Sequence, residues 1–192
     1  MPPKPKFTKE EIVQAALRIV SSKGDEALTA QELKGELGTS ASPIFTVFDS
    51  MGEIREEVRL AAMKRFENFA ADDLSALPPF KQVGMKMVLF GKYEPKLYRL
   101  LFMSENEDVI TFDGLLGKLG DSVRLCLDEV KNDYGLDECE ARALFENVWV
   151  YTFGVGTLCA TRMCDFSKER LGEMLTSQFE AVMMLIRAKR GN

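Results

Sequence analysis

Histidine is absent from the 192 residues of this chain. Without an imidazole group, the sequence excludes a histidine general base, a histidine-ligated zinc site and a histidine-based pH switch. Carboxylates, cysteines, lysines and tyrosines remain, so catalysis is not excluded, but the balance favours a protein that is not an enzyme. We accordingly expect no catalytic residue, no metal site and no cofactor.

Long apolar runs and closely paired cysteines are missing as well. No stretch approaches the roughly 20 apolar residues that a membrane span needs, and no apolar segment typical of a signal peptide follows the first residues. None of the four cysteines (Cys126, Cys139, Cys159 and Cys164) stands in a Cys-x-x-Cys zinc or redox motif. These absences predict a soluble cytoplasmic protein without a membrane partner, whose cysteines are small core side chains.

The chain is instead rich in helix signals. Three times a Ser or Thr precedes a Glu by three residues at the start of an apolar periodic run, at Thr8, Thr29 and Ser50. This spacing is the signature of a capping box, in which the hydroxyl and the carboxylate each accept a backbone N–H. The predicted helices cover residues 8–23, about 29–37 and 50–66.

Between the second and third of these helices, the sequence predicts one more short helix. Gly38 ends the helix before it, and Thr39 or Ser40 is placed to cap it. Pro43 then lies in the first turn, where its missing N–H costs little, and the helix ends near Phe48. A short helix, a glycine turn and a second short helix form a unit that DNA-binding proteins use to present a recognition helix, although many helical packings share the pattern.

The rest of the chain has the same helical periodicity and no convincing alternating strand pattern. Helices are expected over residues 80–92, 96–103, 111–134, 137–164 (interrupted at Gly154 and Gly156) and from Ser167 onward. The predicted fold class is therefore all-α.

Residues 8–66 also carry a specific order of apolar positions, glycines and helix ends. The residues concerned are Ile12, Ala15, Ala16, Gly24, Leu28, Thr29, Ala30, Glu32, Leu33, Glu36, Leu37, Gly38, Thr39, Ser40, Ile44, Phe45, Phe48, Ser50, Glu53 and Ile54. In this order the segment, about a third of the chain, resembles the tetracycline-repressor (TetR) family of bacterial transcription regulators. A second segment, from Trp149 to Gly154, looks like a Trp-x-x-x-His-Gly segment of one branch of that family, with Phe153 where the branch has His.

The resemblance implies an N-terminal three-helix helix-turn-helix domain followed by a C-terminal helical bundle. The DNA-binding domain would cover residues 1–50 (about 5–66 by the family's usual extent, with the motif at 29–48). Residues 51–192 would sense a ligand and form a homodimer through the last two helices. Such a dimer places its recognition helices in successive major grooves of a palindromic operator, about 34 Å apart. A small effector that binds the DNA-incompetent state more tightly releases the DNA, so the implied function is that of a ligand-responsive repressor.

The residues expected to touch double-stranded DNA lie in or near the recognition segment. Hydroxyl groups, first-turn amides and lysines reach phosphates, methyl groups can contact thymine, and Phe45 stands where the family usually has a tyrosine. The candidates are Lys6, Lys9, Thr29, Gln31, Thr39, Ser40, Ala41, Ser42, Phe45 and Thr46. Helix capping alone would equally explain Thr29 and Ser40, and solvation alone would explain Gln31 and Thr46.

The effector site is expected among large, adaptable side chains of the C-terminal bundle. The candidates are Phe90, Phe102, Trp149, Phe153 and Met163. Trp149 and Phe153 stand foremost because they are neighbours on one helix face, and the replacement of histidine by Phe153 favours an apolar effector. Plain core packing is the alternative for each candidate.

Two other functions stay open. The segment from Gly38 to Phe48 has no charged residue, and residues 1–60 hold eight Lys or Arg against ten Asp or Glu. Phosphate neutralisation supplies most non-specific DNA affinity, so one alternative is a TetR-like dimer that binds a ligand or a partner protein with weak or lost DNA binding. The other is an enzyme within the bundle, which rests only on a set of acidic residues that a solvated loop explains as well: Glu105, Glu107 and Asp108.

Overall fold

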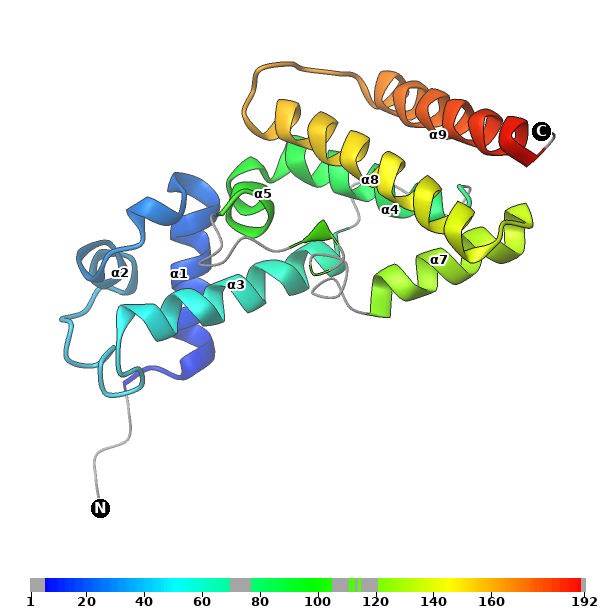
Figure 1. Ribbon diagram of the computed structural model, residues 1–192. Helices are drawn as coiled ribbons and strands as arrows, with labels where there is room; N and C mark the ends of the chain where they lie inside the picture. Colours follow the sequence, from blue (N-terminus) through cyan, green and yellow to red (C-terminus); the bar gives the residue numbers. More distant parts are fainter. Residues whose placement is uncertain (1–5, 70–76, 105–110, 113, 115–120, 191–192) are drawn as a thin grey trace. The chain divides into compact units, whose positions relative to one another are not determined.

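A computed structural model describes residues 6–69, 77–104, 111–112, 114 and 121–190, and among these residues there are helices and turns but no β-strand. The predicted all-α fold class is therefore confirmed. The chain forms two compact units, one of Met1–Phe69 with Tyr93–Ser104 and one of Ala70–Lys92 with Glu105–Asn192 (Figure 1). These units are defined by packing alone. The expected boundary between a DNA-binding domain (residues 1–50) and a ligand-sensing domain (residues 51–192) stays a prediction.

Helix α1 is the centre of the first unit (Figure 1). Its apolar positions, among them Ile12 and Val20, are buried on several sides of the helix, and two consecutive alanines let neighbouring helices approach closely. Four elements therefore close around α1 (Lys9–Lys23): η1 (Asp25–Ala27), α2 (Ala30–Leu37), α3 (Met51–Glu67) and α5 (Pro95–Phe102).

Helices α1, α2 and α3 begin at the three predicted caps, but only the first cap is a complete capping box. The Thr8 hydroxyl accepts the N–H of Glu11, whose carboxylate accepts the N–H of Thr8. At α2 and α3 the hydroxyl accepts the expected N–H, but the Glu side chain turns elsewhere. Glu32 pairs with Lys23 of α1, and the carboxylate of Glu53 accepts the N–H of the residue before the cap.

The short helix predicted to end near Phe48 is not an α-helix. Gly38 ends α2 in the left-handed conformation (φ 61°, ψ 40°), and residues 39–50 form bends and turns. From Ile44 to Phe48 the backbone N–H groups bond carbonyls at mixed spacings, some three and some four residues back. Pro43 supplies no N–H, and a stretch this short gains too few helical hydrogen bonds to become a regular helix. The expected cap by Thr39 or Ser40 was wrong, since within this described segment neither hydroxyl accepts a backbone N–H.

The second unit is built around α8, which lies between α7 and α9 in Figure 1 and packs against both. Its core joins α4, α7, α8 and α9, and the ring of Phe80 lies against those of Phe145 and Phe179. Of the helix predicted over 111–134, residues 113 and 115–120 lie outside the described part of the chain. The helices are α4 (Pro79–Tyr93), α7 (Asp121–Tyr134), α8 (Glu138–Ala160) and α9 (Lys168–Arg190).

Helix α8 runs without the predicted interruption at Gly154 and Gly156. A glycine within a helix costs about 1 kcal/mol relative to alanine. The helix buries nine residues, and the burial of side chains such as Leu144 and Phe145 outweighs that cost. Helix α8 ends at Ala160, earlier than predicted, and α9 begins after Ser167 as predicted, with the Ser167 hydroxyl accepting the N–H of Arg170.

Candidate functional site

Eight of the ten residues predicted to touch DNA lie at two places in the first unit, the start of α2 and segment 39–46. Lys6 and Lys9 lie before and at the start of α1. At the start of α2, Thr29 is the N-cap and accepts the N–H of Glu32, while Gln31 is exposed on the first turn. In segment 39–46, Ser40, Ser42, Phe45 and Thr46 are exposed, whereas Thr39 and Ala41 are half-buried.

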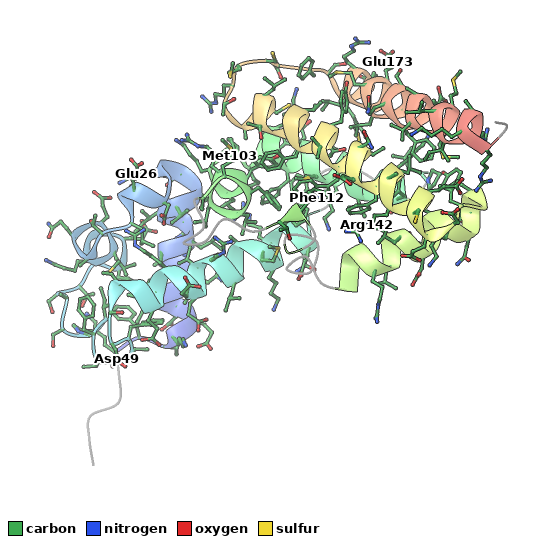
Figure 2. The ribbon with its side chains drawn as sticks, viewed as in Figure 1. Glu26, Asp49, Met103, Phe112, Arg142 and Glu173 are labelled. Carbon is green, nitrogen blue, oxygen red and sulfur yellow. The ribbon has the colours of Figure 1, made fainter. Side chains whose placement is uncertain are left out.

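Two buried side chains hold segment 39–46 against the unit. Ile44 and Phe48 are 0% and 1% exposed. The intervening Phe45 keeps 40% of its surface exposed, and the hydroxyl of Thr46 donates to the carbonyl of Pro43 at 2.8 Å. The arrangement fixes the backbone through its apolar side and offers a ring and hydroxyl groups to solvent. Asp49, labelled in Figure 2, follows this segment.

The lysines near these residues differ in their partners. Lys6 Nζ donates to the hydroxyl of Thr39 at 3.3 Å and lies 5.4 Å from the ring centroid of Phe7. Lys34 Nζ donates to the side-chain carbonyl of Gln31 at 3.1 Å. Both cations therefore sit beside neutral groups. Sequence reasoning did not select Lys34, although its position three residues after Gln31 on a helix is a usable signal.

Lys9, a predicted DNA contact, is engaged by carboxylates instead. Its Nζ lies 2.7 Å from Glu57 Oε1 and 3.8 Å from Glu53 Oε1, and 5.4 Å from the ring centroid of Phe48. The hydrogen bond to Glu57, aided by the nearby negative charges, raises the pKa of Lys9. A phosphate would have to compete with these carboxylates for the same ammonium group.

Arg55 of α3 fixes the chain just before α2. Its guanidinium donates to the Asp25 carboxylate at 2.7 Å, to the Asp25 carbonyl at 3.1 Å and to the Leu28 carbonyl at 2.6 Å. These bonds hold η1 and the start of α2 against α3. Arg55 therefore positions the start of α2, where Thr29 and Gln31 lie. Nothing local in the sequence could identify this role, because the partners lie 27 to 30 residues away.

The foremost ligand candidates form an aromatic cluster in the second unit. Trp149 and Phe153 stack with ring centroids 5.5 Å apart and planes 16° apart, and the ring of Phe112 meets Trp149 edge-on at 5.7 Å. Trp149 and Phe153 are half-buried. The cluster offers a flat, partly exposed aromatic surface of the kind that binds apolar molecules.

The other ligand candidates differ in the unit to which they belong and in exposure. Phe90 is fully buried in α4 of the second unit. Phe102 belongs to the first unit, where it packs on Phe66 and Tyr98. Met163 follows the end of α8 and is 74% exposed.

A polar feature of the second unit escaped sequence reasoning. Thr152 of α8 is 2% exposed, and its hydroxyl has no hydrogen-bond partner among the described residues. A Cβ atom at Gly84 of α4 would lie 3.6 Å from this hydroxyl oxygen. A buried hydroxyl is normally hydrogen-bonded, so this one is an internal site able to donate to a polar group.

The cysteines agree only in part with the predicted core role. Cys126 and Cys159 are buried, and burial raises the pKa of Cys159 and raises that of Cys126 to about 11. Burial therefore disfavours the reactive thiolate form of both. Cys139 and Cys164 are exposed, so the core prediction was wrong for these two.

In the described part of the chain, no three Cys, Asp or Glu side chains lie close enough to hold a metal ion together. No helix among the same residues has the length and apolar character that crossing a membrane requires. Glu105, Glu107 and Asp108, on which the enzyme alternative rests, lie outside the described residues.

Comparison with known proteins adds no family assignment. No protein-family model matches this chain, and a search of curated proteins finds no match either. The resemblance of residues 8–66 to the TetR family therefore stays an expectation from the sequence.

Proposed function

We propose that the protein is a ligand-responsive, DNA-binding transcriptional regulator, a repressor that acts as a homodimer on a palindromic operator. The observation that carries the proposal is segment 39–46, a hydroxyl-rich surface stretch that follows a short helix and a left-handed glycine. Ile44 and Phe48 bury their side chains on its inner side, so the backbone is fixed while Phe45 and Thr46 face solvent. Rigid presentation of short polar and aromatic side chains suits contacts to phosphates and base edges.

The charges beside this surface support phosphate contacts. Lys6 and Lys34 donate to the neutral groups of Thr39 and Gln31, so a phosphate can approach both ammonium groups without displacing a carboxylate. Each such contact releases counterions from DNA and makes binding depend on salt.

The second unit supports the remaining parts of the proposal. Val150 on α8 and Met184 and Leu185 on α9 are 54%, 71% and 57% exposed, and these apolar positions suit a dimer formed through the last two helices. The stack of Trp149 on Phe153 suits an apolar effector. An effector that favours the DNA-incompetent state then lowers operator affinity.

The proposal is tested by fluorescence anisotropy with DNA from upstream of the protein's own gene, over a range of salt concentrations. We expect saturable binding that weakens steeply with salt. Lys6→Gln and Lys34→Gln should each reduce the slope of log affinity against log salt by about 1. Lys64→Gln, an exposed lysine in the last turn of α3, is the matched control and should leave the slope unchanged. Absence of binding at about 50 mM salt would contradict the proposal.

A second candidate function is a TetR-like dimer that binds a ligand or partner protein with weak or lost DNA binding. The pairing of cations with carboxylates favours it, since Lys9 is engaged by Glu57. Four further cations of the first unit are bound in the same way, in the pairs Arg18–Glu36, Lys23–Glu32, Arg55–Asp25 and Arg65–Glu94. A stable dimer that binds no DNA in the experiment above, but that binds a ligand or a partner protein, would favour this function over the first.

A further inference from the structure

An open, polar pocket of about 290 Å³ lies within the first unit, away from segment 39–46 in the sequence. One wall comes from the end of α1 and from η1, and the other from α5 and the two residues after it. Figure 2 labels one lining residue on each wall, Glu26 on η1 and Met103 just after α5.

Two of the cations that line the pocket have no partner among the residues that the structure describes. Lys96 and Arg99 are one turn apart on α5, and in the described part of the chain their side chains make no ion pair or hydrogen bond. Lys23, the third cation of the lining, pairs with Glu32. Asp25, one of the two lining carboxylates, is likewise taken up by Arg55. The uncompensated charges of the pocket are therefore two positive groups and the carboxylate of Glu26.

The Lys96 side chain lies along the pocket wall. A Cβ atom at Gly24 would lie 3.7 Å from its Cδ and 3.9 Å from its Nζ. Gly24 has a φ of 98°, a value that favours glycine. The absence of a side chain there lets the ammonium group lie against the backbone. Beside it, Leu100 is 9% exposed and gives the pocket an apolar surface.

We propose that this pocket binds a small organic dianion, a phosphomonoester or a dicarboxylate. The guanidinium of Arg99 matches the planar geometry of two oxyanion oxygens, and Lys96 adds a second positive charge. Glu26 faces them across the pocket and accepts a hydroxyl group of the same molecule. Leu100 and Met103 contact its carbon atoms, and the volume suits a small metabolite. The pocket lining includes none of the residues proposed to contact DNA and none of the aromatic cluster around Trp149.

Isothermal titration calorimetry of the full chain tests the proposal with three probes: glycerol 3-phosphate, succinate and inorganic phosphate. We expect saturable binding of glycerol 3-phosphate or succinate, tighter than that of inorganic phosphate. Which of the two organic probes binds more tightly distinguishes a phosphomonoester from a dicarboxylate. Arg99→Gln and Lys96→Gln should each weaken this binding by about tenfold. Glu26→Gln should strengthen the binding of succinate, which has no hydroxyl group, because a like charge is removed.

Lys64→Gln, on α3 in the same unit but outside the pocket lining, is the control and should bind as the unsubstituted chain does. Circular dichroism checks that each variant keeps its helix content. Binding that survives both Arg99→Gln and Lys96→Gln would overturn the proposal. So would the absence of saturable binding by any probe up to about 10 mM. Neither result bears on DNA binding, which the anisotropy experiment measures separately.

Discussion

Arg190, in the last turn of α9, holds the carboxylate of Glu140, in the first turn of α8, through two hydrogen bonds from its guanidinium. The same guanidinium donates to the carbonyl of Gly135 at 2.8 Å, and Glu140 also accepts the N–H of Asp137 at 2.9 Å. A cation at a helix C-terminus and an anion at a helix N-terminus both interact favourably with the helix dipoles. One ion pair therefore joins the ends of α7, α8 and α9.

This ion pair predicts a specific loss of stability in acid. The hydrogen bond from Arg190, and then the N–H of Asp137, lower the pKa of Glu140 from 4.5 to about 2. Because the pKa is lower in the folded state, the stabilisation is complete above about 4.5 and is lost as pH falls toward 2. Glu140→Gln should therefore destabilise the protein clearly at pH 7 and less at pH 3, as measured by urea unfolding.

Glu180→Gln, which alters an exposed carboxyl group on α9, is the control for this pH experiment. It should change the free energy of unfolding little at either pH. An equal effect of Glu140→Gln at pH 7 and pH 3 would show that the ion pair does not contribute to folding.

The unpartnered hydroxyl of Thr152 makes Thr152→Val a stabilising substitution. Valine has the same shape, and a buried hydroxyl without a hydrogen bond costs stability, so we expect a gain of about 1 kcal/mol. Thr161→Val is the contrasting control, because the Thr161 hydroxyl donates to the carbonyl of Thr157 at 2.7 Å. Thermal and urea unfolding measure both. A loss of stability in Thr152→Val would mean that this hydroxyl has a bound partner in solution.

Two glycines of α2 should respond to alanine with opposite signs. At both Gly35 and Gly38 an added Cβ would have open space within 4 Å, so only the backbone distinguishes them. Gly35 lies within the helix, and Gly35→Ala should stabilise the protein by up to about 1 kcal/mol. Gly38 has a φ of 61°, and Gly38→Ala should destabilise it by about 1 kcal/mol because alanine is strained there. Urea unfolding measures the stability of both variants. A change of the same sign in both would contradict the left-handed conformation of Gly38.

The exposed ring of Phe45 predicts a gain of DNA affinity in Phe45→Tyr. A phenolic hydroxyl at this exposed edge adds one donor for a phosphate oxygen, worth about 1 kcal/mol, or roughly a fivefold tighter complex. Anisotropy titration at fixed salt measures the change. Phe48→Tyr is the control, since that ring is 1% exposed and a hydroxyl there should lower stability instead. Unchanged affinity in Phe45→Tyr would remove this ring from the proposed DNA surface.

Trp149 is the single tryptophan of the chain, so its fluorescence reports on the aromatic cluster directly. If an apolar effector binds there, titration with it should change the emission of Trp149, and Phe153→Leu should weaken binding because the stacked ring is lost. Met163→Ala should bind normally, since Met163 is 74% exposed beyond α8. Weakening by Met163→Ala but not by Phe153→Leu would place the effector elsewhere.

The sequence by itself determined the helices, because caps, glycines and apolar periodicity act within a few residues of chain. Thr8 and Ser50 cap helices where predicted, and Gly38 ends α2. The spacing of Trp149 and Phe153 was enough to bring their rings together, since residues four apart share a helix face. Local spacing failed for the stretch after Pro43, where helical periodicity is present but the segment is too short to form a regular α-helix.

Only the tertiary structure decided which side chains those helices bring together. Lys9 is bound by Glu57, Phe102 and Phe153 lie in different compact units, and the polar pocket depends on Lys96 lying beside Gly24. These relationships join residues about 50 or 70 positions apart, and neither periodicity nor capping carries information over that distance. The packing of whole helices selects such partners through buried area and charge.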